Sequence, residues 1–296
     1  MRETKIQPLP LILLGSLVLI WGTNWPVLKL TLNYLPPIWA VFLRTFPAFV
    51  VIFIVCALTK QLKLPAKEDL PVVFSVVFFH MIGFSVLVSF GLLHITAGRS
   101  IVIAYTTPLW VLPLASIFLR EKITWAKGLG LFLGLAGLAF ILEPASLEWT
   151  QNSVMFGQLL ILGGAFSWAI SIVYGRAHKW VSTPFKILPW QLLLASVLEF
   201  FIAYIAEGPL PEVTWTSELI FYLAYSSLLG TALAYLLMNI VSRDVPASYT
   251  SIILLGVPVV GILTSAIVLS EPMDISLYIG SLLILTGIWL ATRAQR

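Results

Sequence analysis

Long apolar stretches separated by short polar connections follow one another along the whole chain. A helix that crosses a bilayer core of roughly 30 Å needs about 20 mainly apolar residues. Windows of that length fall at residues 10–32, 36–58, 70–93, 97–119, 123–143, 155–177, 186–207, 217–241, 246–269 and 275–292. These segments are apolar on all sides, whereas strands of a membrane barrel alternate apolar and polar positions. The pattern predicts an all-α integral membrane protein with ten transmembrane helices.

The composition agrees with this prediction and limits where function can reside. Of the 296 residues, 59% are hydrophobic and 10% are charged, which is outside the balance of soluble domains. The connections between the windows are too short to fold separately, so any functional site must lie among the helices. Cys56 is the single cysteine and excludes an internal disulfide and a cysteine metal cluster. The first window lacks a small-x-small cleavage site, and we expect it to be a retained span.

The positions of the cations predict the orientation. All Lys and Arg residues except Lys29, Arg44 and Arg99 fall on one side of the predicted spans, together with both termini. The positive-inside rule places that side in the cytoplasm. The net charge of +4 is explained by these topology signals, and we expect no nucleic-acid partner.

The second half of the sequence repeats the first. A shift of 150 residues brings a proline, a glutamate and two glycines into register, and a shift of 147 does the same for two residues of the first span. The pairs are Pro108 and Pro258, Glu121 and Glu271, Gly130 and Gly280, Gly137 and Gly287, Trp21 and Trp168, and Asn24 and Ser171. We expect two repeats, residues 1–148 and 149–296, with five helices each.

An odd number of helices per repeat inverts the second copy relative to the membrane. Inverted repeats are the architecture of many secondary transporters, which expose a central site to each face in turn. A channel can also contain inverted repeats, so the architecture alone leaves both classes open.

Three motifs resemble a known family. They are "WGTNWPVLKL" in the first span, the Pro-x(12)-Glu pattern of "PLWVLPLASIFLRE", and its copy "PVVGILTSAIVLSE". With the glycine-rich helix after each glutamate, the chain from about Leu11 to Ala291 is similar to the drug/metabolite transporter superfamily, EamA type. The resemblance implies a multi-pass carrier of the bacterial inner membrane that exports amino acids or other metabolites, and the chain is most similar to the aromatic-amino-acid exporter branch. We expect a small-molecule substrate, lipid contacts, a functional monomer and no cofactor.

Two prolines in the fourth and ninth spans are candidate hinges. Pro108 and Pro258 each remove a helical hydrogen bond and free a carbonyl group. Irregular backbone of this kind occurs in membranes where protein buries it or where it lines a cavity. The alternative is a packing kink that contacts no substrate.

The two repeat-related glutamates are expected to shape the helical hairpins. Glu121 and Glu271 end their helices, where a carboxylate opposes the helix dipole. The start of a neighbouring helix is a better partner. We therefore interpret them as structural charges and not as a proton relay.

Aromatic and polar side chains at mid-depth are candidates for substrate binding. Indole N–H groups at that depth need a partner, and flat rings suit an aromatic or aliphatic substrate, although buried packing explains them equally well. The candidates are Trp21, Asn24, His80, Tyr105, Thr106, Trp110, Trp168, Ser171 and Tyr235.

Ionisable groups within the spans are rare. His80, Arg44 and Glu199 lie well inside their helices, where such groups are functional candidates by default. His80 is either a packing histidine or a ligand for substrate or protons. For Arg44, a structural pair with Glu199 or with freed carbonyl groups is the simpler interpretation.

These features favour a secondary exporter of small zwitterions, with aromatic amino acids first. A drug or organic-cation exporter of the same fold is the alternative, since Glu199 supplies a deep carboxylate that such exporters use beside aromatic rings. No metalloprotease or hydrolase motif occurs, and an enzyme is not expected. No metal site is expected either.

Overall fold

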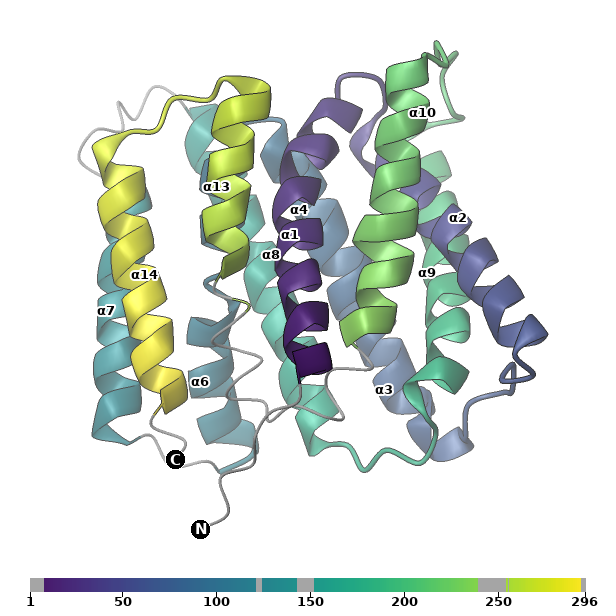
Figure 1. Cartoon of the computed structure of the whole chain (residues 1–296), viewed down its shortest axis with the longest axis horizontal. Coiled ribbons are helices and arrows are strands. Elements are labelled where there is room, and N and C mark those ends of the chain that lie inside the picture. The colour runs from purple at the N-terminus through teal and green to yellow at the C-terminus, as the bar shows by residue number, and fades with distance from the viewer. Residues whose placement is uncertain (1–7, 121–123, 143–151, 239–253, 255, 294–296) are drawn as a thin grey trace.

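The chain folds into a bundle of helices that run roughly parallel to one another (Figure 1). The computed structural model describes residues 8–120, 124–142, 152–238, 254 and 256–293. Helix α1 begins and α14 ends at the same edge of the bundle, which we name the inner end because the positive charges are predicted there. The opposite edge is the outer end.

The first half contains five helical segments, two of which change helix type or break. The third consists of a π-helix between two α-helices, and the fourth is interrupted between α5 and α6. The bounds are α1 (Pro8–Thr31), α2 (Pro37–Leu58), η1 (Lys67–Asp69), α3 (Leu70–Ser75), η2 (Val76–Phe84), α4 (Ser85–Leu92), α5 (Ala97–Ala104), α6 (Thr107–Phe118) and α7 (Trp125–Leu142).

The second half repeats this order. Its third segment again contains a π-helix, and the described part of its fourth segment begins two residues before Pro258. The bounds are α8 (Asn152–Ala177), α9 (Pro184–Glu207), α10 (Ser217–Ala224), η3 (Tyr225–Leu233), α13 (Gly256–Leu269) and α14 (Ile275–Arg293).

The outside of the bundle is apolar, as a lipid environment requires. Within the described residues, seven helical segments are long and apolar enough to span a bilayer, and three shorter apolar helices complete the ten. Large side chains such as Ile12, Phe46, Phe132 and Leu282 are exposed on the surface, where lipid tails replace water as their solvent. The predicted fold class, an all-α membrane protein with ten helices, is confirmed.

Helices α7 and α14 pack in a way that reflects the repeat. They lie side by side at one edge of the bundle (Figure 1). A Cβ atom on Gly137 would lie 2.6 Å from the carbonyl oxygen of Gly280, and one on Gly287 would lie 2.4 Å from that of Gly130. Because Gly130 and Gly280 are repeat mates, as are Gly137 and Gly287, the contact is reciprocal, as expected for two inverted copies. Small residues permit this close approach.

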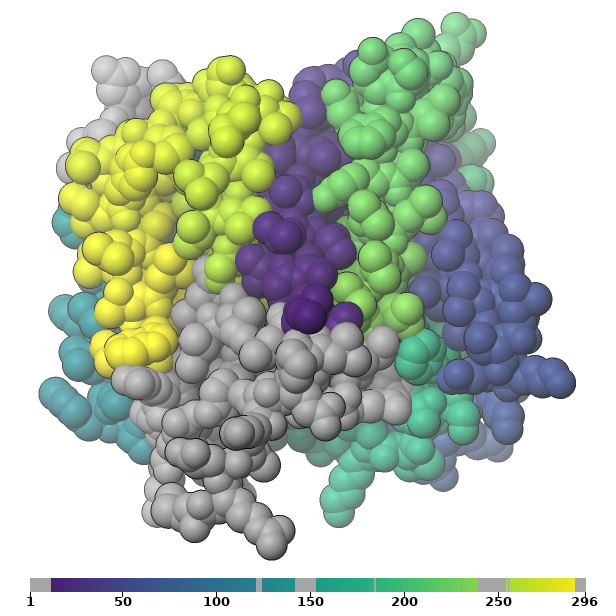
Figure 2. Space-filling view, in the orientation of Figure 1, coloured from purple at the N-terminus to yellow at the C-terminus, as the bar shows by residue number. Residues whose placement is uncertain are grey.

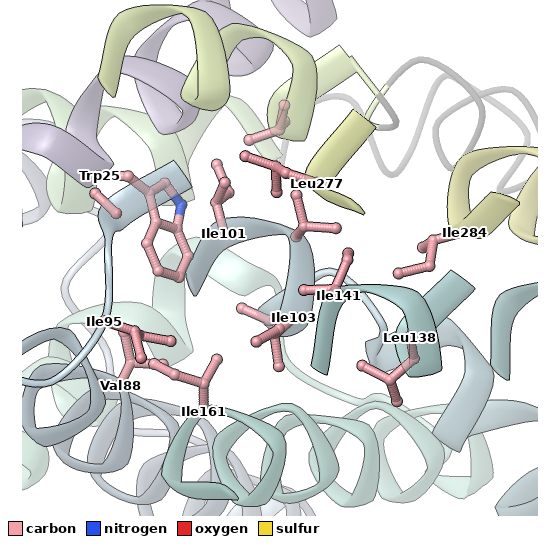
Figure 3. Close-up of a cluster of buried hydrophobic side chains, with 14 of the residues drawn as sticks. Trp25, Val88, Ile95, Ile101, Ile103, Leu138, Ile141, Ile161, Leu277 and Ile284 are labelled. Carbon is pink, nitrogen blue, oxygen red and sulfur yellow. The ribbon is translucent and has the colours of Figure 1, made fainter. Parts of the chain in front are cut away.

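The largest apolar cluster lies next to this pair and joins both halves. Figure 3 shows Trp25, Ile101 and Ile161 facing one another from α1, α5 and α8, with Ile141 and Ile284 extending the cluster into α7 and α14. On the front of the bundle, α1 is visible between α13 and α10 (Figure 2). Apolar packing thus holds helices of both repeats around α1 and α5.

Polar contacts join the helices at the outer end. Glu271 accepts hydrogen bonds from the backbone N–H groups of Ala97 and Gly98 at 2.7 and 2.9 Å. Arg99 pairs with Asp274 at 2.7 Å. Burial raises the pKa of the Asp274 carboxyl, but a hydrogen bond from the backbone of Leu277 and the charge of Arg99 outweigh burial and hold this pKa below its ordinary value.

A second set of polar contacts lies at the inner end and crosses between the repeats. The carboxylate of Asp69 contacts the His178 ring at 2.7 Å. It also accepts hydrogen bonds from the backbone N–H groups of Val181 and Ser182. These bonds attach the start of the third segment to the connection between α8 and α9.

Candidate functional site

A central cavity of about 100 Å³ lies between the two repeats. A single water needs at least roughly 10–15 Å³ measured in this way, so the space accommodates a small molecule or several waters. Seven of the predicted site residues line it: Trp21, Asn24, Arg44, His80, Tyr105, Trp168 and Tyr235. The structure therefore brings together side chains from six predicted spans that are up to 214 residues apart (Trp21 to Tyr235).

One wall of the cavity is aromatic. The His80 ring stacks on the indole of Trp168 with a centroid distance of 5.0 Å and an interplanar angle of 13°. Phe84 packs against Trp168 at 5.1 Å, and Tyr105 meets it edge-on at 6.2 Å. The Tyr235 hydroxyl lies 3.3 Å from Nε2 of His80. These rings form a flat, largely apolar surface with polar atoms at its margin.

Another part of the lining comes from α1 and η3. The Trp21 indole donates a hydrogen bond to the carbonyl oxygen of Gly230 at 3.3 Å. Ser226 donates to Oδ1 of Asn24 at 2.7 Å. A Cβ atom on residue 230 would lie 2.8 Å from the Asn24 amide, so glycine is required there for Asn24 to occupy its place.

The π-helices occupy equivalent positions in the two repeats. η2 spans Val76–Phe84 and η3 spans Tyr225–Leu233, and both bounds differ by 149 residues (225 − 76 and 233 − 84). η2 contributes His80 to the cavity, and η3 contributes Gly230 and Thr231. π-Helical segments are frequent at functional sites because the wider turn redirects side chains.

The charged groups lie to one side of the aromatic wall. Arg44 lines the cavity and donates through Nη2 to the Ser85 hydroxyl at 2.9 Å. Glu199 is fully buried and does not line the cavity. In the described part of the chain, the carboxyl group of Glu199 interacts with the Thr45 side chain, and no ion pair joins it to Arg44. Arg44 and Glu199 thus interact electrostatically without the direct pair expected from the sequence.

Three of the nine predicted substrate-binding residues, Thr106, Trp110 and Ser171, lie outside the cavity lining. Trp110 donates its indole N–H to the Thr106 hydroxyl at 3.2 Å, and that hydroxyl donates to the carbonyl oxygen of Ile103. Trp110 also packs edge-on against Phe166. Ser171 is buried away from the cavity. These contacts satisfy the polar groups within the helix packing.

One of the two candidate hinges, Pro108, lies at a helix start. Pro108 is in the first turn of α6, where a missing N–H costs no helical bond, and the helix is interrupted at Tyr105 and Thr106. The Thr107 hydroxyl donates to the carbonyl oxygen of Ala104 at 2.8 Å, four residues before Pro108, and the Thr106 hydroxyl donates to that of Ile103. The interruption places Tyr105 in the cavity. Pro258 is buried in α13.

Of the two glutamates that were expected to be structural charges, Glu271 lies within the described residues. Glu271 accepts the two backbone hydrogen bonds at the start of α5 given above, which is a favourable position for a carboxylate. Glu121 lies outside the described residues.

Several lining residues were not singled out from the sequence. They are Trp25, Thr45, Ser85 and Ser89. Trp25 lies four residues after Trp21, and Ser89 lies four after Ser85, so each pair shares a helix face. The four-residue spacing of these side chains within apolar spans was the sequence signal that could have identified them as lining residues.

Comparisons with known proteins agree with this architecture. The sequence profile of the EamA-like transporter family matches residues 9–143 and 155–293. The chain is similar to "Uncharacterized transporter YoaV" of Bacillus subtilis (strain 168), with 29% identity over 94% of each chain. It is 25% identical to the "Probable amino-acid metabolite efflux pump" of Escherichia coli (strain K12), covering 92% of this chain and 91% of that protein.

A solved crystal structure has the same fold. It aligns with a TM-score of 0.63 and 16% identity over 97% of this chain and 98% of the other. At this identity the likeness concerns the fold alone. Since the family profile matches nearly all of both halves, this chain is a membrane transporter, not an enzyme, and belongs to the EamA-like transporter family.

Proposed function

We propose that the protein is a secondary exporter of amino acids, with aromatic and hydrophobic ones preferred, and that the central cavity is its substrate site. The observation that carries this proposal is the stack of His80 on Trp168 between the two repeats. A flat aromatic wall suits an aromatic side chain, because offset and edge-on ring contacts stabilise beyond the burial of area. The name of the Escherichia coli relative supports the same substrate class.

The charge in the cavity favours an amino acid over an organic cation. Arg44 lines the cavity, whereas Glu199 does not. A cationic drug would meet Arg44 without a compensating carboxylate on the cavity surface. The organic-cation alternative therefore ranks second.

We propose that the protein works as a monomer in the bacterial inner membrane with both termini in the cytoplasm. The repeats, with bounds at 1–148 and 149–296, expose the cavity alternately to the two faces. The boundary between them lies outside the described residues.

Transport by the purified protein tests this proposal. We would reconstitute it in proteoliposomes and measure uptake of labelled tryptophan, phenylalanine, leucine and organic cations under imposed pH and voltage gradients. We expect saturable uptake of the amino acids, with the aromatic ones first. Uptake of organic cations alone would refute the proposal.

A pH series in the same system examines coupling. If His80 exchanges protons during transport, His80→Ala changes the pH dependence of uptake. An unchanged affinity and pH profile would leave His80 with a packing role only.

A further inference from the structure

Arg44 and the His80–Trp168 stack lie at different depths of the cavity. Counting 1.5 Å per residue, Arg44 lies about 10 Å from the outer start of α2 at Pro37. Trp168 lies about 14 Å from the inner end of α8 at Ala177 on the same count. Arg44 thus belongs to the outer half of the cavity and Trp168 to the inner half. Ser85 and Ser89 line the cavity beside Arg44.

The guanidinium group of Arg44 has unused hydrogen-bonding capacity. It carries five N–H donors, and Nη2 donates to Ser85. Its Nε atom is buried without a partner in the described part of the chain. A buried donor without an acceptor costs free energy, and this cost is removed when an acceptor enters the cavity. The fixed fork of N–H groups matches a carboxylate, which binds two of them at once.

Glu199 is fully buried, does not line the cavity and interacts electrostatically with Arg44. Because no direct bond joins them, Glu199 leaves the Arg44 N–H groups available. This arrangement keeps a cation in an apolar bundle and still presents its donors to a ligand.

A second, smaller pocket adjoins the central cavity at Arg44. Arg44, Ser89 and Leu28 line the central cavity and also a pocket of about 10 Å³ that includes Thr31, at the outer end of α1. Arg44 therefore lies between the central cavity and the space toward the outer face.

We infer that Arg44 and Ser85 form a carboxylate-binding subsite at the outer end of the cavity. The substrate then lies with its carboxylate on Arg44 and its side chain against His80 and Trp168. This inference rests on the proposed function and adds the orientation of the substrate and the residue that selects for a carboxylate.

Three related ligands and three variants of the full chain test the subsite. The ligands are tryptophan, indole-3-propionate, which lacks the amine, and tryptamine, which lacks the carboxylate. The variants are Arg44→Lys, the double variant Arg44→Gln/Glu199→Gln, and Arg176→Gln as a control in an exposed arginine at the inner end of α8. The double variant avoids leaving a buried charge without its partner. Binding is measured as the ligand-induced rise in Tm and as inhibition of labelled tryptophan exchange.

We expect the wild type and Arg176→Gln to prefer both carboxylate ligands to tryptamine. The double variant should bind tryptophan and indole-3-propionate roughly tenfold or more weakly, with tryptamine unchanged. Arg44→Lys should weaken the carboxylate ligands severalfold, because a lysine is a point charge and not a fork. This variant keeps the attraction to Glu199 and tests the subsite even if the double variant fails to fold.

The outcomes separate the two proposals. Equal affinity of the wild type for tryptamine and tryptophan, or unchanged affinities in Arg44→Lys, would overturn the subsite while amino acid export stands. Binding of indole-3-propionate that depends on Arg44, without transport of any amino acid, would refute the proposed function and leave the subsite. Binding of tryptamine alone would overturn both.

Discussion

The imidazole ring of His80 stacks on the indole of Trp168 with 5.0 Å between their centroids. His80 belongs to the π-helix η2 of the first repeat, and Trp168 to α8 of the second. The contact therefore joins the two halves at the cavity. A movement that separates the two repeats at the cavity would break this stack.

The stack predicts a substrate-dependent effect of Trp168→Ala. An aromatic contact contributes about 0.5–1.5 kcal/mol, so removal of the indole should lower the affinity for tryptophan up to roughly tenfold. The affinity for leucine should fall less, and Trp168→Phe should give an intermediate result. Competition against labelled tryptophan measures these affinities, with Trp215→Phe at an exposed site as the control. Equal losses for tryptophan and leucine would argue against an aromatic contact with the substrate.

Gly230→Ala should impair both stability and transport. The added Cβ would lie 2.8 Å from the Asn24 amide, which is fixed by its bond from Ser226. Asn24 must move, and overpacking of this kind costs about 1–3 kcal/mol. Thermal unfolding in detergent and tryptophan uptake measure the two effects.

Gly15→Ala is the matched control for that substitution. No atom lies within 4 Å of a Cβ at Gly15, and alanine is favoured over glycine in a helix by up to about 1 kcal/mol. This variant should be as stable as the wild type or more so. If both variants behave alike, the close contact between η3 and Asn24 has no importance.

Glu271→Gln should weaken the outer end of the bundle. The carboxylate accepts hydrogen bonds from Ala97 and Gly98 at the start of α5, and loss of a helix cap costs about 0.5–2 kcal/mol. The amide retains one acceptor oxygen but not the charge that complements the helix dipole. Thermal unfolding should show a lower Tm than for Glu212→Gln, a change at an exposed loop residue. Equal values would assign Glu271 no capping role.

Replacing Pro108 and Pro258 by alanine tests the hinges. Alanine permits α5 and α6 to join into one helix, which would withdraw Tyr105 from the cavity. We expect slower transport and altered accessibility of cavity cysteines from the two faces. Pro113→Ala is the control, because Pro113 lies inside α6 and its repeat position is Leu263. Unchanged transport and accessibility in the double proline variant would exclude a hinge role.

The membrane-spanning segments and many of the residues that line the cavity could be predicted from the sequence. Length and hydropathy determine how many segments cross a bilayer, so the predicted window at 36–58 and helix α2 at Pro37–Leu58 differ by one residue at the start. The repeat then pointed to Trp21 and Trp168, which both line the cavity. Depth in the membrane is readable from sequence because helical rise is constant.

Rotation about the helix axis was not readable from the sequence. Tyr105 lines the cavity and its neighbour Thr106 does not, although both lie at the same depth. A span that is apolar on all sides has no polar face to indicate which side faces inward. The π-helices η2 and η3 also rotate the side chains that follow them about the helix axis, and no residue pattern in the sequence predicted these π-helices. Ser85 and Ser89 share a helix face, and their four-residue spacing was a polar signal in that span.

Counterflow of labelled tryptophan in proteoliposomes tests the central claim most directly, because it requires a carrier that returns loaded. Vesicles preloaded with unlabelled tryptophan should accumulate the label transiently above equilibrium with the wild type. Trp168→Ala should reduce the rate at low substrate concentration. Accumulation that is absent, or that is equal in the wild type and Trp168→Ala, would contradict an aromatic amino acid site between His80 and Trp168.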